Sequence, residues 1–102
     1  MSVLAPTRAE DLLDREGRPY FLWDDDMSLQ EFRTRLTDAD DEVRAYFIGK
    51  LMRQAKPDDV FTFVSLSEIE RLWASTSRYL GHTRDFWTWL LAQWRVTPHG
   101  AV

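Results

Sequence analysis

Apolar side chains recur at helical spacing along most of this chain, and this pattern constrains the fold more than any other feature. In the longest run, residues 40–55, Val43, Phe47, Leu51 and Ala55 follow one another at steps of four. That spacing places side chains on one face of an α-helix. No convincing alternating run typical of a half-buried strand is present. The sequence therefore predicts an all-α fold, a compact bundle of five or six short helices.

Capping signals indicate where these helices begin. A Ser or Thr followed three residues later by Glu can satisfy the free N–H groups at a helix start. Three such capping boxes occur, Thr7 with Glu10, Ser28 with Glu31, and Ser67 with Glu70. The expected helices span residues 7–16, 28–36, 40–55, 58–63, 67–79 and 83–94, with Gly17, Pro57 and Leu80-Gly81 as breaks between them.

The segment Val60–Val64 is the least certain of these elements, because its residues also favour β-strands. Taken alone it could form a strand. We interpret it as helix, since helical patterns flank it and no second strand is available to pair with it.

Two further features concern the core. The run Pro19 to Trp23 is expected to be irregular and to place its rings in the core, because Pro19 disfavours helical angles at the residue before it. Gly49 interrupts a strong helical pattern at a cost of about 0.5–1 kcal/mol relative to Ala. This favours a close helix crossing at Gly49, with close approach of a partner as the alternative.

Length and composition limit the domain organisation and location. A chain of 102 residues fits one domain, 1–102, with residues 1–6 and 96–102 expected to fray. Cysteine is absent, which removes disulfides and thiolate chemistry. No signal-peptide pattern or apolar run of about 20 residues is seen, so we expect a cytoplasmic protein without a membrane span.

Charge is unevenly distributed. Residues 1–42 carry twelve acids and five bases, and residues 43–102 carry five acids and eight bases, for a net charge of −4. An acidic surface repels phosphate backbones, so nucleic acid is disfavoured as a partner. It would attract a basic protein surface. The alternative is an acidic face that only contacts solvent.

Motifs that carry catalysis or cofactors are missing. The four glycines are scattered, so no phosphate-binding loop can form, and neither His82 nor His99 lies in a metal-ligand spacing. The adjacent Asp24, Asp25 and Asp26 lack the spacing of a calcium loop and predict a solvated turn before Ser28. We therefore expect no enzyme activity, no cofactor and no metal.

Aromatic residues are the remaining signal, and they favour a protein partner. In the last helix Phe86, Leu90 and Trp94 form the expected inner stripe, widened by Trp87 and Leu91, and Trp89 lies off it. Trp is a common anchor of protein interfaces. The expected partner-binding residues are Asp24, Asp25, Asp26, Trp87 and Trp89. The oligomeric state is left open.

A DNA-binding regulator is the alternative function. The helices expected at 67–77 and 83–94 could form a helix-turn-helix. The second of them offers only Arg84, Gln93 and Arg95 to read base edges, besides its tryptophans.

Residues 18–94 also resemble a known group of proteins. The run Pro19-Tyr20-Phe21-Leu22-Trp23-Asp24 is followed by a capped helix, by residues 44–55 (RAYFIGKLMRQA) and by Asp58-Asp59-Val60-Phe61. This order resembles short all-helical bacterial proteins with a PYFLWD-type motif, often encoded beside abortive-infection-type nucleotidyltransferase toxins. The resemblance implies an antitoxin-like inhibitor of such a toxin. This chain has Asp-Asp-Asp where Asp-Tyr-Asp is commoner in the group.

Overall fold

The computed structural model describes residues 6–15, 17–22, 24 and 26–96, although the side chains of Ala9, Trp94, Arg95 and Val96 are not described. Within these residues the backbone is helical and forms no strand, apart from one isolated antiparallel bridge between Leu13 and Pro19. The prediction of an all-α fold is confirmed. The ends expected to fray lie almost entirely outside the described residues.

Seven α-helices and three 3-10 turns make up the described chain. They are α1 (Ala9–Leu12), η1 (Tyr20–Leu22), α2 (Leu29–Leu36), α3 (Asp41–Gln54), α4 (Pro57–Phe63), α5 (Leu66–Arg71), α6 (Trp73–Thr76), η2 (Ser77–Tyr79), η3 (Gly81–Thr83) and α7 (Arg84–Val96). The segment Val60–Val64 lies mainly in α4 and is not a strand, as we interpreted it. The number of α-helices exceeds the expected six because the helix predicted at 67–79 is divided.

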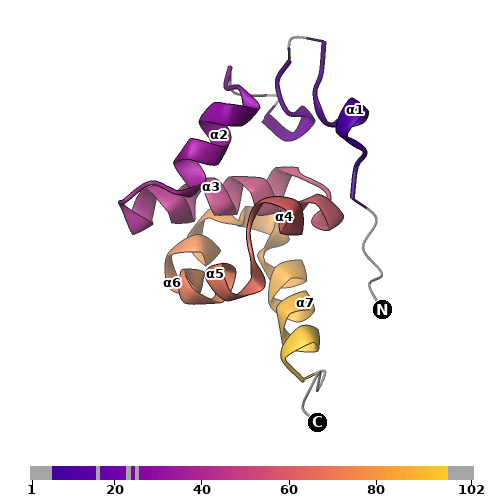
Figure 1. Ribbon diagram of the computed structural model, residues 1–102. Helices are drawn as coiled ribbons and strands as arrows, with labels where there is room; N and C mark the ends of the chain where they lie inside the picture. The colour runs from indigo at the N-terminus through magenta and orange to yellow at the C-terminus, as the bar shows by residue number, and fades with distance from the viewer. Residues whose placement is uncertain (1–5, 16, 23, 25, 97–102) are drawn as a thin grey trace.

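Helix α3 is the centre of the arrangement. Figure 1 shows α2 packed on one side of α3, with α5 and α6 on the other side and α7 extending away from the remaining helices. The buried side of α3 carries Ala45, Ile48, Leu51 and Met52. Because these residues recur at helical spacing, one amphipathic helix organises the core.

Aromatic rings fill the space between η1, α2 and α4. Phe21 and Phe32 are fully buried, and their ring centroids lie 5.2 Å apart in an edge-to-face arrangement. Phe63 lies 5.6 Å from the Phe21 ring and 5.7 Å from the Phe32 ring. Edge-to-face packing is a favoured geometry for such rings. The prediction that the Pro19–Trp23 run places rings in the core is confirmed for Phe21, while Trp23 lies outside the described residues.

The three predicted capping boxes have different outcomes. Ser28 and Glu31 form a complete box at the start of α2. The box predicted at Ser67 is wrong by two residues, because Ser65 accepts the N–H of Glu68 and α5 begins at Leu66. Two overlapping Ser-x-x-Glu patterns exist here, and the tertiary structure uses the first of them.

The box predicted at Thr7 is wrong for a different reason. The backbone N–H and the hydroxyl of Thr7 both donate to the carboxylate of Asp59 in α4, and the N–H lies 2.6 Å from it. The hydroxyl of Tyr20 donates to the same carboxylate. This long-range network replaces a local cap, and the first helix ends at Leu12 rather than near residue 16. Asp59 therefore joins three segments that are distant in sequence.

Gly49 is the point where the divided helix approaches α3. The chain departs from helical geometry at Leu72, where ψ is 12°, and α6 and η2 then cross α3. A Cβ placed on Gly49 would lie 2.7 Å from the Cβ of Tyr79 and 3.3 Å from the carbonyl oxygen of Thr76. The prediction of a close crossing at Gly49 is confirmed.

This crossing predicts the sign of a simple substitution. Gly49→Ala should lower the free energy of unfolding by about 1–2 kcal/mol, because overpacking outweighs the gain in helix propensity of about 0.5–1 kcal/mol. Both close neighbours are main-chain or Cβ atoms, which cannot turn away. Urea denaturation followed by circular dichroism measures the change. A variant as stable as the wild type would contradict the crossing.

Candidate functional site

The orientation of α7 decides which of its tryptophans reaches the surface. Trp87 is 1 % exposed, so the prediction that it contacts a partner at the surface is wrong. Its indole N–H donates to the carbonyl oxygen of Met52 at 2.9 Å. Met52 lies in the last turn of α3, where carbonyl groups lack partners within the helix. Satisfying this carbonyl fixes Trp87, and with it α7, in the observed orientation.

The burial of Trp87 leaves Phe86 exposed. Consecutive residues of a helix are turned by about 100° from each other. Trp87 and Leu91 are buried, Leu90 is half-buried and Phe86 is 43 % exposed. The prediction that Phe86 belongs to the inner stripe is therefore wrong. The side chain of Trp94, the third member of that predicted stripe, lies outside the described part of the chain.

Trp89 is the most exposed large apolar side chain in the described structure, at 57 %. Its ring centroid lies 6.4 Å from that of Phe86, and the exposed Gln93 follows one turn later. We call Phe86, Trp89 and Gln93 the outer stripe of α7. The sequence contains no charged residue from Phe86 to Trp94. The outer stripe is therefore an uncharged aromatic surface on an otherwise charged molecule.

Asp24 of the predicted aspartate turn lies beside α3, where a lysine binds its carboxylate. Asp24 accepts hydrogen bonds from the ammonium of Lys50 at 2.9 and 3.0 Å, and Lys50 is 3 % exposed. The bond from Lys50 holds the pKa of Asp24 below its ordinary value. Asp26 is 98 % exposed and lies 3.9 Å from Arg18. Asp25 lies outside the described residues. Asp24 thus compensates a buried charge, whereas Asp26 faces solvent.

A shallow pocket of about 320 Å³ lies beside Asp24. Its lining consists of Asp24, Arg53, Gln54 and His82. Arg53 donates to the carbonyl oxygen of Tyr79 at 3.0 Å, and Gln54 donates to the carbonyl oxygen of Phe21 at 3.0 Å. These side chains therefore hold surrounding loops to the end of α3. Because Asp24 is engaged by Lys50 and Gln54, it is poorly placed to act as a base.

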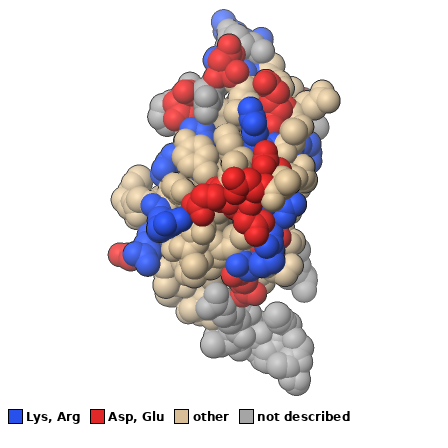
Figure 2. All heavy atoms as spheres, turned by 90° about the vertical axis from the view of Figure 1, so that its left-hand side faces the viewer, with Lys and Arg blue, Asp and Glu red and all other residues tan. Residues whose placement is uncertain are grey.

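The uneven charge along the chain is partly compensated by ion pairs within the structure. Figure 2 shows acidic side chains gathered in the middle of one face, with Lys and Arg side chains beside them. Arg71 pairs with Asp41 at 3.1 Å, and Arg78 pairs with Glu42 at 2.7 Å. Both pairs join the acidic first part of the sequence to its basic second part. Sequence reasoning missed this pairing, because the partners are 30 and 36 residues apart.

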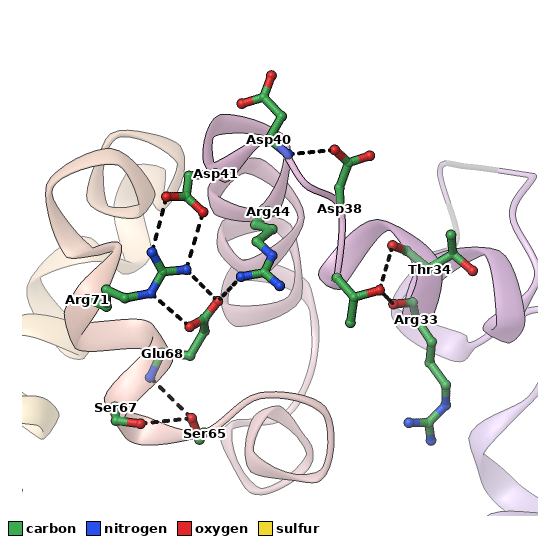
Figure 3. A network of polar contacts seen from close by, with 11 residues as sticks. Arg33, Thr34, Asp38, Asp40, Asp41, Arg44, Ser65, Ser67, Glu68 and Arg71 are labelled. Atoms are coloured by element: carbon green, nitrogen blue, oxygen red, sulfur yellow. Dashed lines mark hydrogen bonds and ion pairs between the residues drawn. The ribbon is translucent and has the colours of Figure 1, made fainter.

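Glu68 extends this network across α3 and α5. Figure 3 shows its carboxylate between the guanidinium groups of Arg71 and Arg44, which lie 3.0 Å from it. The bond from Arg71 is the main cause that lowers the pKa of Glu68. The acidic face is thus part of a helix-linking network. At its edge, Asp38 accepts the backbone N–H of Asp40 (Figure 3), and Asp40 accepts the backbone N–H of Glu42.

The C-terminal helices do not favour readout of DNA. The first expected helix, at 67–77, is divided among α5, α6 and the start of η2, and η3 follows before α7. Residues 67–94 therefore do not form two regular helices joined by one tight turn. The exposed side of α7 carries the aromatic Phe86 and Trp89, and Arg84 and Gln93 are the described side chains there that could reach base edges.

Among the described residues, no group of three or more His, Asp or Glu side chains is placed to hold a metal ion. None of the described helices has the length and apolar character needed to cross a membrane. The chain matches no protein-family model, no curated protein and no solved structure. The outer stripe of α7, with its exposed Phe86 and Trp89, is the candidate site.

Proposed function

We propose that this chain is a non-enzymatic protein-binding module whose outer stripe of α7 docks on a partner protein. The exposure of Trp89 beside Phe86 carries this proposal. Burying a Trp ring in a partner's pocket contributes strongly to affinity, and Trp is a frequent hot-spot residue. Exposed aromatic surface on an otherwise polar molecule commonly marks an interaction site.

The specific role that we propose is antitoxin-like inhibition of a nucleotidyltransferase-type toxin in the cytoplasm. It rests on the resemblance of residues 18–94 described above. An enzyme that acts on RNA needs a basic groove, and the exposed Asp26 and the acidic residues at the edge of α3 would complement such a groove. In this proposal the outer stripe supplies affinity, and the acids speed the encounter.

Substitution of Trp89 tests whether the outer stripe of α7 binds the proposed partner, the product of the neighbouring gene. We expect Trp89→Ala to weaken binding to the neighbouring gene's product at least about tenfold, because a hot-spot ring is lost. The matched control is Thr88→Ala, an exposed neighbour on the same helix but off the outer stripe. Co-expression, co-purification and titration calorimetry measure binding, and circular dichroism confirms that both variants fold.

Two outcomes would contradict the proposal. If the wild-type chain neither co-purifies with that product nor relieves its toxicity, the antitoxin-like role fails. If a complex forms and Trp89→Ala binds as tightly as Thr88→Ala, the partner uses another surface than the outer stripe.

A further inference from the structure

Another pocket, of about 280 Å³, lies where the end of α2 meets α3 and the junction of α4 with α5. One side of its lining is apolar and includes Leu36, Phe63 and Val64. The other side is polar and includes Arg44, Ser65 and Glu68. Small-molecule sites in proteins commonly have a volume of about 300–1,000 Å³ and combine an apolar wall with a few polar groups. The pocket therefore has the make-up of a site for a small ligand.

The guanidinium of Arg44 has hydrogen-bonding capacity that the protein leaves unused. Its Nη1 donates to Glu68 at 3.0 Å. Its Nε is buried and has no hydrogen-bond partner among the described residues. Nε and Nη2 form the other edge of this planar group, and Figure 3 shows that edge turned away from Glu68, toward the end of α2. Because buried donors in proteins are nearly always paired, this edge needs an acceptor from outside the described chain.

Arg33 adds a second guanidinium beside the apolar side of the pocket. Its central carbon lies 4.8 Å from the centroid of the Phe63 ring. Within the described part of the chain, Arg33 forms no ion pair with a carboxylate. Figure 3 shows that Asp38, which lies on the same side of the network, accepts the backbone N–H of Asp40 instead. Two arginines therefore flank the pocket with charge to offer to a ligand.

The acidic Glu68 does not cancel this positive charge. Its carboxylate is shared between Arg44 and Arg71, each at 3.0 Å, and Arg71 also pairs with Asp41. The hydrogen bond from Arg71 is the main cause that lowers the pKa of Glu68, so this group stays ionised and compensated at neutral pH. Counting Arg33, three guanidinium groups face two carboxylates in this cluster. One positive charge remains, although the whole chain carries a net charge of −4.

We propose that this pocket binds a small organic acid, a carboxylate carried on a short apolar group. The carboxylate accepts N–H bonds from the Nε–Nη2 edge of Arg44, because arginine binds carboxylates most strongly through two parallel bonds. The apolar group lies against Leu36, Phe63 and Val64. The small volume of the pocket restricts the ligand to a free acid of this size. Because α7 supplies none of the described lining residues, this proposal can fail or hold independently of the proposed partner at the outer stripe.

Hydrocinnamate, which joins a carboxylate to a phenyl ring through two methylene groups, is a suitable probe. In two-dimensional amide NMR spectra of the isotope-labelled chain, it should cause saturable shifts at Ser65 and Glu68, with a dissociation constant roughly in the millimolar range expected for so small a ligand. Hydrocinnamamide has nearly the same shape without the charge, and it should bind at least about tenfold more weakly. If neither amide shifted up to the solubility limit of the probe, or if the acid and the amide bound equally, the proposal would be overturned. This comparison uses the wild-type chain and does not depend on the folding of a variant.

Two arginine substitutions test which guanidinium holds the carboxylate. Arg44→Gln and Arg71→Gln each remove one partner of Glu68 and one positive charge, but only Arg44 lines the pocket. In the same titration, Arg44→Gln should raise the dissociation constant of hydrocinnamate at least about tenfold. Arg71→Gln should raise it less than about threefold, because salt screens charges outside the pocket. Circular dichroism checks that both variants fold, and equal weakening by the two substitutions would overturn the role of Arg44.

Discussion

Trp87→Ala should lower the free energy of unfolding by about 3–5 kcal/mol, the typical cost of removing a large aromatic side chain from a core. Trp87 is the largest fully buried side chain of the described structure. Its loss leaves a cavity between α7 and α4, where the ring lies 6.2 Å from that of Phe61. It also leaves the carbonyl of Met52 without its donor. Small domains have a total free energy of unfolding of about 5–15 kcal/mol. The loss expected for Trp87→Ala is therefore a large fraction of the stability.

Trp89→Ala provides the control for this prediction. The same substitution two residues later should change the stability by less than about 0.5 kcal/mol, because Trp89 is mainly exposed. Urea denaturation of both variants measures the difference. Equal destabilisation would contradict the orientation of α7, since it would place Trp89 in the core as well.

Asp59→Ala should lower the free energy of unfolding by about 2–4 kcal/mol at neutral pH. Asp59 is 1 % exposed, and its carboxylate accepts hydrogen bonds from Thr7 and Tyr20. Without it, the three donors of these residues lose a charged acceptor, and hydrogen bonds to charged groups contribute about 1.5–3 kcal/mol each. The fully exposed Asp26 is the control, and Asp26→Ala should change stability by less than about 0.5 kcal/mol.

The effect of Asp59→Ala should depend on pH. Burial by itself raises the pKa of Asp59, but the hydrogen bonds from Thr7 and Tyr20 outweigh burial and lower the pKa below its ordinary value of 3.8. The stabilisation by Asp59 is therefore present above that value and is lost as the pH falls toward the lower pKa of the folded state. We expect the difference in the free energy of unfolding between wild type and Asp59→Ala to become smaller below about pH 4. If this difference in the free energy of unfolding stayed constant in acid, it would contradict the hydrogen-bond network around Asp59.

Tyr20 belongs to the same hydrogen-bond network, and its ionisation should affect stability at alkaline pH. Burial, together with the hydrogen bond to Asp59, raises the pKa of Tyr20 from 10.0 to about 12. Its stabilising contribution is complete below pH 10 and is lost as the pH rises toward about 12. Tyr20→Phe should remove this alkaline loss, and an absorbance titration of the tyrosines measures the pKa directly.

Local patterns predicted the helices well where no distant residue competed for the same groups. Ser28 and Glu31 cap α2 because both partners lie within one turn and face solvent. The four-residue spacing in α3 predicted its length, with the helix ending at Gln54 before Pro57. Gly49 could be interpreted as a crossing point because its local cost indicates a compensating contact.

The first helix and the last helix show where local patterns failed. The pattern at Thr7 is a valid cap, but the carboxylate of Asp59, 52 residues away, engages its hydroxyl and N–H groups. In α7, Phe86 and Trp87 are adjacent aromatic residues, and the sequence pattern placed Phe86 on the inner stripe, whereas the structure buries Trp87. Trp87 is buried because its indole N–H donates to the carbonyl of Met52, 35 residues away. The phenyl ring of Phe86 has no such donor.

By itself, the sequence determined the all-α class, most helix positions and the presence of more indole surface than one helix face can bury. These properties follow from spacing and from capping groups within one or two turns. The tertiary structure alone decided that Trp89 and Phe86 face solvent, that Asp24 neutralises the buried Lys50, and that the acids of α3 pair with Arg71 and Arg78. Each of these depends on a hydrogen bond or ion pair between distant segments, and no local pattern encodes which distant group will be the partner.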